Sequence, residues 1–158
     1  MLSSKAKYAM RAVLTLAEDH GADEWTTAFD IAERAVIPLK YLEAILVELR
    51  AAGMVESRRG AAGGHRLALA PGELTVAEVV RLMDGPIALT PCASRLNFEA
   101  CKDCVSVHTC RIRRIMQRAR DAAAAVLEGC SISDMMQVPD LQERVLPHSR
   151  LRRSKNHS

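Results

Sequence analysis

Aromatic side chains are scarce in this chain of 158 residues, which contains only two Phe, two Tyr and one Trp. Small aliphatic residues, mainly Ala, Leu and Val, supply most of its 49% hydrophobic content. Strands favour aromatic and β-branched side chains, whereas closely packed helices are well served by small ones. The composition therefore predicts a mainly α-helical globular fold.

Long hydrophobic runs are also missing. No stretch approaches the roughly 20 apolar residues that span a bilayer, and the opening MLSSKAKYAM lacks the hydrophobic region of a signal peptide. We therefore expect a cytoplasmic protein with no membrane partner. The net charge is only +3, which excludes a polycation that coats nucleic acid unspecifically. Any DNA binding must come from local basic patches.

Catalytic patterns are absent as well. The chain has no phosphate-binding loop and no nucleophile with a paired base. Its five histidines are scattered without catalytic spacing, at positions 20, 65, 108, 148 and 157. We expect neither an enzyme nor a small-molecule substrate.

Cysteine, by contrast, is concentrated in one stretch, PCASRLNFEACKDCVSVHTCRIRRIM, which holds Cys92, Cys101, Cys104 and Cys110. A disulfide framework is not expected in a reducing compartment, and four buried hydrophobic cysteines would be unusual in so polar a loop. Thiolates are soft ligands for zinc, copper(I) or iron–sulfur clusters. The spacing matches neither common zinc ribbons nor ferredoxins, so zinc, a cluster and a thiol switch all remain open. Cys130 is expected to be a buried apolar residue.

Three helices are predicted in the first third of the chain, at 3–18, 28–35 and 38–53. Ser3 or Ser4 can cap the first helix, Thr27 with Asp30 resembles a capping box for the second, and a proline is favoured at the first position of the third. The last two helices, joined by a tight turn, form a helix-turn-helix.

The segment that follows predicts a wing. Residues 54–59 and 66–69 are typical of two strands, and the glycines between them permit a sharp turn. In a winged helix one helix enters the major groove and the hairpin lies over the neighbouring backbone or minor groove. Tyr41 has an alternative interpretation as a core side chain. The predicted DNA-contacting residues are Lys40, Tyr41, Glu43, Arg58, Arg59, Gly60, Gly63, Gly64 and Arg66.

Two further helices are predicted after Pro71-Gly72. Thr75 and Glu78 form a capping box for a helix over 76–83. A longer helix begins at Arg111 and carries apolar residues spaced by three and four, which predicts pairing with a second copy in a homodimer. That stripe consists of Ile112, Ile115, Met116, Ala119, Ala123 and Val126. Serines 131 and 133 can cap a final short turn, and the basic tail 147–158 is expected to be disordered.

These motifs together resemble the bacterial winged-helix transcriptional regulators of the Rrf2 type, over nearly the whole chain to about Gln137. The resemblance lies in the opening SSKAKYAMRAVL, the helix-turn-helix IAERAVIPLKYLEAILVELRAAGMV, the wing SRRGAAGGHRLAL, the helix TVAEVVRLMDGP and the cysteine loop ahead of a long helix. It implies a homodimer with crossing long helices that binds a partly palindromic double-stranded DNA operator.

The resemblance also implies a ligand set. Cluster-binding members use three cysteines at positions that match Cys92, Cys104 and Cys110. The fourth ligand varies, and the two usual positions hold Arg113 and Lys7 here, which are charged side chains with no free lone pair. We infer that Cys101 completes an all-cysteine set, with His108 as the alternative fourth ligand.

The sequence thus predicts a homodimeric, sequence-specific DNA-binding regulator, expected to be a repressor, that responds to redox state or to an iron–sulfur cluster of the two-iron, two-sulfur kind. The expected divisions are a winged domain (1–84), a cysteine-rich sensor loop (85–110), a dimerisation helix with its cap (111–137) and a basic tail (138–158). Two alternatives stay open. One is a winged-helix regulator with structural zinc or a thiol switch, and the other is an electron-transfer protein on a winged-helix scaffold.

Overall fold

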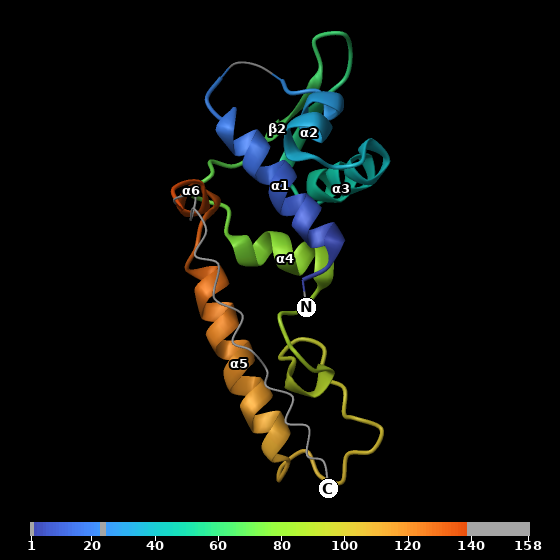
Figure 1. Ribbon diagram of the computed structural model, residues 1–158, viewed down its shortest axis with the longest axis vertical. Helices are drawn as coiled ribbons and strands as arrows, with labels where there is room; N and C mark the ends of the chain where they lie inside the picture. The colour runs from blue at the N-terminus through green and yellow to red at the C-terminus, as the bar shows by residue number, and fades with distance from the viewer. Residues whose placement is uncertain (1, 23–24, 139–158) are drawn as a thin grey trace, which may run out of the picture.

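The computed structural model describes residues 2–22 and 25–138 (Figure 1). The basic tail expected at 147–158 lies outside these residues. The elements, in chain order, are α1 (Ser4–Glu18), α2 (Ala28–Ala35), α3 (Leu39–Ala51), β1 (Val55–Arg58), β2 (Gly64–Leu67), α4 (Val76–Asp84), the short 3-10 turn η1 (Pro91–Ala93), α5 (Arg111–Glu128) and α6 (Ile132–Met136). The predicted mainly helical fold with a two-stranded wing is confirmed.

Helix α1 is the centre of the winged head, because α2, α3, α4 and β2 all contact it. The Ser3 hydroxyl accepts a hydrogen bond from the backbone of Ala6, which confirms Ser3 as the N-cap. Alanines 6, 9 and 12 are fully buried along α1. Such small side chains let neighbouring helices approach closely, which accounts for the scarcity of aromatic residues in the core.

The turn between α2 and α3 is tighter than the sequence suggests. Val36 adopts a left-handed conformation with φ of 54°, and Ile37 N–H donates to the Ala32 carbonyl at 2.9 Å. Left-handed backbone is unusual for a β-branched residue, so packing of the two helices must hold it. Pro38 is the N-cap of α3 and not its first residue, so the helix begins one residue later than predicted.

The wing is an antiparallel hairpin in which Val55 pairs with Leu67 and Arg58 with Gly64. The prediction of a second strand over 66–69 was wrong in its bounds, because pairing already begins at Gly64. A Cβ on Gly63 would lie 2.2 Å from the Arg58 carbonyl oxygen, and one on Gly64 would lie 2.6 Å from that of Thr26. Gly63 is therefore required by the close packing of the wing itself, and Gly64 by the close approach of the segment that contains Thr26.

The end of the described chain returns to the head. The predicted capping box of Thr75 and Glu78 begins α4 and is confirmed. Ile132 of α6 is fully buried in the head's core, and its N–H donates to the Leu74 carbonyl at 2.8 Å. Cys130 is half-buried at the edge of this core. The head is consequently closed by a segment that follows α5 in the chain.

Helix α5 forms an arm that extends away from the head, and the cysteine-containing segment runs beside it (Figure 1). The arm contacts α4, where Arg81 pairs with Glu128 at the last residue of α5, and it also contacts η1. Arg120 is its one buried residue. Among the described residues, no helix combines the length and hydrophobicity needed to cross a membrane.

Candidate functional site

The first turn of α3 presents the side chains predicted to contact DNA. Lys40, Tyr41 and Glu43 are all exposed, whereas Leu42, between them in the sequence, is buried. Tyr41 is 65% exposed, and its ring centroid lies 6.5 Å from that of Tyr8 on α1. This exposure rules out the alternative interpretation of Tyr41 as a core residue.

The wing arginines differ in what surrounds them. Arg58 and Arg59 are exposed beside the turn. Arg66 is instead engaged within the head, since its guanidinium lies 4.4 Å above the Trp25 ring and 2.9 Å from the Glu56 carboxylate. Stacking and ion pairing hold a guanidinium in place and compete with phosphate. Arg59 is therefore better placed than Arg66 for a DNA backbone.

The base of the wing is held by a third extended segment. Thr26 and His65 exchange two backbone hydrogen bonds, of 3.0 and 2.8 Å. The His65 ring shares a hydrogen bond of 2.8 Å with the Ser57 hydroxyl. Burial lowers the pKa of His65 from its ordinary value of 6.5, and the positive charge of Arg50 lowers it further.

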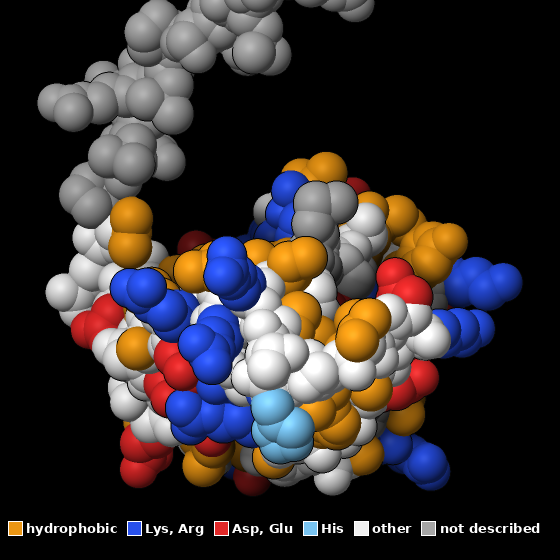
Figure 2. Space-filling model, turned by 90° about the horizontal axis from the view of Figure 1, so that it is seen from below, with side chains coloured by type: hydrophobic (Ala, Val, Ile, Leu, Met, Phe, Trp, Pro, Cys, Tyr) orange, Lys and Arg blue, Asp and Glu red, His pale blue; other side chains and the backbone are white. Residues whose placement is uncertain are grey.

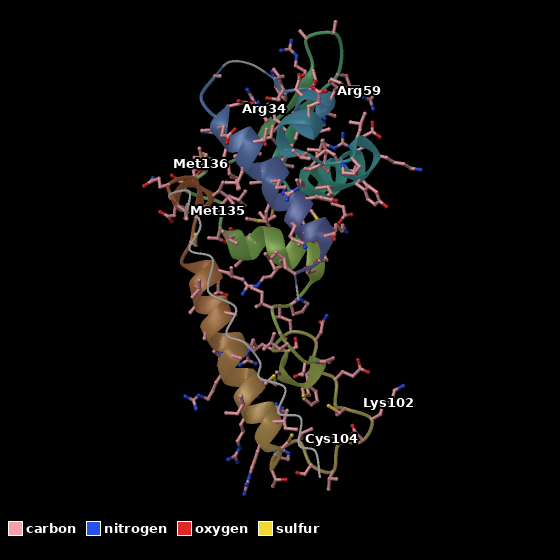
Figure 3. All side chains as sticks on the ribbon, viewed as in Figure 1. Arg34, Arg59, Lys102, Cys104, Met135 and Met136 are labelled. Atoms are coloured by element: carbon pink, nitrogen blue, oxygen red, sulfur yellow. The ribbon has the colours of Figure 1, made fainter. Side chains whose placement is uncertain are left out.

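The cysteine loop lies at the other end of the molecule. Figure 3 places Arg59 in the wing at one end and Cys104 near the start of α5 at the opposite end. The residues predicted to contact DNA and the cysteines are therefore spatially separate, and α5 contacts both α4 of the head and η1 of the loop.

The four loop cysteines differ in exposure. Cys92 lies in η1 and is only 6% exposed, Cys104 and Cys110 are half-buried, and Cys101 is exposed. The pKa of Cys101 is raised, first by its hydrogen bond to Cys92 and then by the opposing negative charges of Cys92 and Cys104. Cys92, Cys101 and Cys104 are thus electrostatic neighbours.

These thiols suit a soft metal chemically, but they are not yet gathered around one point. In the described part of the chain, no group of three or more His, Cys, Asp or Glu side chains is arranged to hold a metal ion. The segment between η1 and α5 is a series of turns without helix or strand. Its thiols would have to close together around a metal or cluster.

Cys110 has the most specific surroundings, because it is the N-cap of α5. Its sulfur accepts a hydrogen bond from the Arg113 amide at 3.4 Å. Thiolates are favoured at helix N-termini and beside arginines. The first turn of α5 has no acidic residue and carries Arg111, Arg113 and Arg114. Viewed from this end of the molecule, several Lys and Arg side chains form a group on the left, and others lie at the right edge (Figure 2).

Sequence reasoning missed two arginines that contact this loop. Arg113 and Arg120 donate to the backbone carbonyls of Cys92 and Ala93 in η1. The sequence did contain one indication, at Arg113. A basic residue at a helix N-terminus interacts unfavourably with the helix dipole, so its presence there suggests another contact that stabilises it. His108, the alternative fourth ligand, is exposed, and its carbonyl accepts from Arg114 at 3.5 Å.

Comparison with known proteins gives a consistent result. The Rrf2 family model, described as iron-dependent transcriptional regulators, matches residues 2–138. An rrf2-like HTH-type transcriptional regulator of Rhodobacter capsulatus is 38% identical over 138 residues, covering 86% of this chain and 92% of that protein. The HTH-type transcriptional regulator IscR of Aliivibrio salmonicida is 32% identical over 142 residues, covering 90% and 80%.

Solved structures agree. CymR, the global cysteine regulator of B. subtilis, matches with a TM-score of 0.70 at 30% identity, over 86% of this chain and 95% of that one. IscR of T. potens matches with a TM-score of 0.65 at 28% identity, over 86% and 85%. These relatives are regulators and not enzymes, as the missing catalytic motifs predicted. This chain belongs to the Rrf2 family of helix-turn-helix transcriptional regulators.

Proposed function

We propose that the protein is a homodimeric, sequence-specific DNA-binding regulator, acting in the cytoplasm as a repressor, whose cysteine loop senses redox state through an iron–sulfur cluster. The winged head (1–84), closed by α6, binds the operator, the loop (85–110) is the sensor, and the arm formed by α5 within 111–137 joins two copies. The DNA contacts are those predicted above, with Arg59 foremost and Arg66 the least available.

The observation that carries this proposal is the double position of Cys110. It is the last cysteine of the loop and also the N-cap of α5. A change at its sulfur alters the hydrogen bond from the Arg113 amide, so it acts directly on the first turn of the arm. A chemical change at the loop cysteines can therefore alter the conformation of α5, the helix that positions the two heads.

The charges around the loop support a negatively charged group. The basic first turn of α5 and its helix dipole both attract negative charge to this place. Cys92, Cys104 and Cys110 are the proposed ligands, with Cys101 as the fourth. A cluster bound there would supply a redox-sensitive link between the loop and α5, while the chain's own residues hold the thiols and connect them to the arm.

The surface of α5 supports a homodimer. Its apolar stripe is uncovered: Ile112 is 70% exposed and Val126 is 69% exposed. Burying a side chain of this size yields about 1.5–3 kcal/mol, and a two-fold interface gains it twice. The equivalent face of a second copy is a covering surface of matching chemistry and length.

The cluster is tested by anaerobic absorption spectroscopy together with iron, sulfide and zinc analysis of the same sample. We expect visible absorbance and iron with sulfide, both lost in Cys104→Ala and Cys110→Ala and retained in Cys130→Ala. Zinc in place of iron would support the structural-zinc alternative. A sample that contains neither metal would support a thiol switch.

Sequence-specific binding is tested by selection from random duplexes, with competition by unrelated DNA. Enrichment of a partly palindromic site is the expected outcome. Failure to enrich any sequence would favour the remaining alternative, an electron-transfer protein on a winged-helix scaffold.

A further inference from the structure

We propose that Arg113 and Arg120 form a two-point clamp that fixes the backbone of η1 to α5 and so holds Cys92 in place for ligation. Neither arginine is a ligand. Both act through the position of Cys92, and the inference deepens the proposed sensor function of the same loop.

Arg113 reaches two separate parts of the loop. Its Nε donates to the Cys92 carbonyl at 2.8 Å, and its Nη1 donates to the Val107 carbonyl at 3.3 Å. Its guanidinium also lies 5.4 Å from the centre of the Phe98 ring. The backbone amide of the same residue donates to the sulfur of Cys110. One residue therefore connects two proposed ligand positions, Cys92 and Cys110.

Arg120 makes the second point. It follows Arg113 by seven residues, which places both side chains on one face of α5, about two turns apart. Its Nη1 donates to the carbonyl of Ala93, which is fully buried. Arg120 itself is 9% exposed, and its guanidinium donates to the Asp121 carboxylate, which also pairs with Arg95. This carboxylate compensates the buried charge and fixes the direction of the side chain.

The clamp divides the cysteines into two classes. Cys92 is buried and tied to α5 through its own carbonyl, and Cys110 is tied through its sulfur. For Cys101 and Cys104, the described contacts run only within the loop, as in the Cys104 amide donating to the Cys101 carbonyl at 3.1 Å. Cys92 and Cys110 form a fixed half of the site, onto which the other two thiols close.

The clamp is tested on the full-length reduced protein without added metal, by labelling with N-ethylmaleimide and quantifying each cysteine by mass spectrometry. Losing one hydrogen bond from a charged donor weakens a contact by roughly tenfold or more. We therefore expect Arg113→Ala and Arg120→Ala each to raise the labelling rate of Cys92 about tenfold. Cys130, which lies at the edge of the head's core, should label at the wild-type rate and serves as an internal reference.

The matched control is Arg114→Ala, which removes an exposed arginine from the same helical turn. The one described hydrogen bond of its side chain is the 3.5 Å bond to the His108 carbonyl, so Cys92 should label as in wild type. The clamp is refuted if only one of the two variants exposes Cys92, if neither does, or if Arg114→Ala does so equally. Should Arg120→Ala prove unfolded by circular dichroism, Arg113→Ala alone decides the question.

A conservative variant separates geometry from charge. Lysine at position 113 keeps the charge but has no planar fork to reach two carbonyls, so Arg113→Lys should label at a rate between wild type and Arg113→Ala. Full restoration of the wild-type rate would mean that charge alone holds the turn, contrary to the clamp.

A second readout links the clamp to the proposed cluster. In protein that binds iron, transfer of iron to a chelator should be about tenfold faster in Arg113→Ala, and an unchanged rate would overturn the positioning role. Because labelling needs no metal, it tests the clamp even if the proposed cluster is absent. A colourless wild-type protein, conversely, would contradict the sensor function and leave the labelling result unaffected.

Discussion

The winged head and the α5 arm are stabilised in different ways. The head buries a continuous core of small aliphatic side chains from α1 to α4 and α6, and its α1, α2, α4 and α6 helices begin at side-chain caps. The arm has 18 residues in α5, of which only Arg120 is buried, and its contacts with the loop are largely polar. The head is complete within one chain, whereas the arm presents uncovered apolar surface and loosely connected thiols.

This difference indicates where regulation acts. A packed core resists partial change, because small displacements cost contacts on all sides. Turns held by a few hydrogen bonds to one helix rearrange far more easily. We therefore expect chemical signals to alter the arm and loop and to leave the structure of each head unchanged.

The largest effect is expected from breaking the head itself. Leu42 of α3 is fully buried in the head's core, so Leu42→Ala should lower the free energy of unfolding by about 2–5 kcal/mol. Urea unfolding followed by the fluorescence of Trp25, the one tryptophan in the chain, measures this change. Val126→Ala on the arm should change head unfolding by less than about 0.5 kcal/mol. A comparable loss in both variants would mean that head and arm fold as a single unit.

The next prediction concerns the dimer interface, and it introduces a negative charge into the uncovered apolar stripe of α5. Ile112→Asp should weaken dimerisation about 100-fold, since two apolar side chains are lost from a symmetric interface. Sedimentation of a dilution series measures the dimer, and Trp25 fluorescence should remain that of a folded head. The control is Ala125→Asp, which adds the same charge away from the stripe and should leave the dimer intact. If Ile112→Asp sediments as wild type, the stripe is not the interface.

Within the head, the two kinds of wing arginine can be separated. Arg59→Ala should weaken operator binding about tenfold and reduce the salt dependence by about one phosphate contact. Arg66→Ala should have a smaller effect on DNA and a larger one on Trp25 fluorescence, because Arg66 is stacked on that ring. Equal losses of affinity, measured by fluorescence anisotropy at several salt concentrations, would show that the stacked arginine also contacts DNA.

The smallest effect concerns pH. His65 has a lowered pKa, so it stays neutral in the folded wing at pH values where the unfolded chain already binds a proton. Its contribution to stability is therefore complete above pH 6.5 and is lost as pH falls through the folded pKa. The slope cannot exceed about 1.4 kcal/mol per pH unit for one proton. Urea unfolding of wild type and His65→Gln between pH 5 and pH 8 should show a steeper loss of stability in wild type than in the variant.

Local sequence signals predicted most of the head correctly. Thr75 and Glu78, Ser3 and Thr27 begin helices where the capping patterns placed them, because caps depend on residues only three positions apart. The family, the helix-turn-helix and the wing were also predicted correctly. The start of β2 was not, because Gly64 is required by contact with Thr26, which is distant in sequence.

The cysteine loop was less predictable for a physical reason. Its position next to α5 depends on side chains from two turns of a helix that donate to backbone carbonyls about 20 or more residues earlier. Every residue has the same backbone carbonyl, so no sequence pattern indicates which carbonyl an arginine will contact. The assignment of Cys101 as the fourth ligand, and of the DNA-contacting residues one by one, remains a prediction.

The bridge between Thr26 and His65 affects how the protein can recognise the half-sites of an operator. By joining the wing to the segment that leads into α2, it fixes the distance between recognition helix and wing within one head. Each head then binds a half-site as one rigid unit. In a dimer of two such heads, the distance between the heads is the quantity that can change. We expect natural operators of this protein to vary more in the spacing between half-sites than in the arrangement of contacted bases inside a half-site.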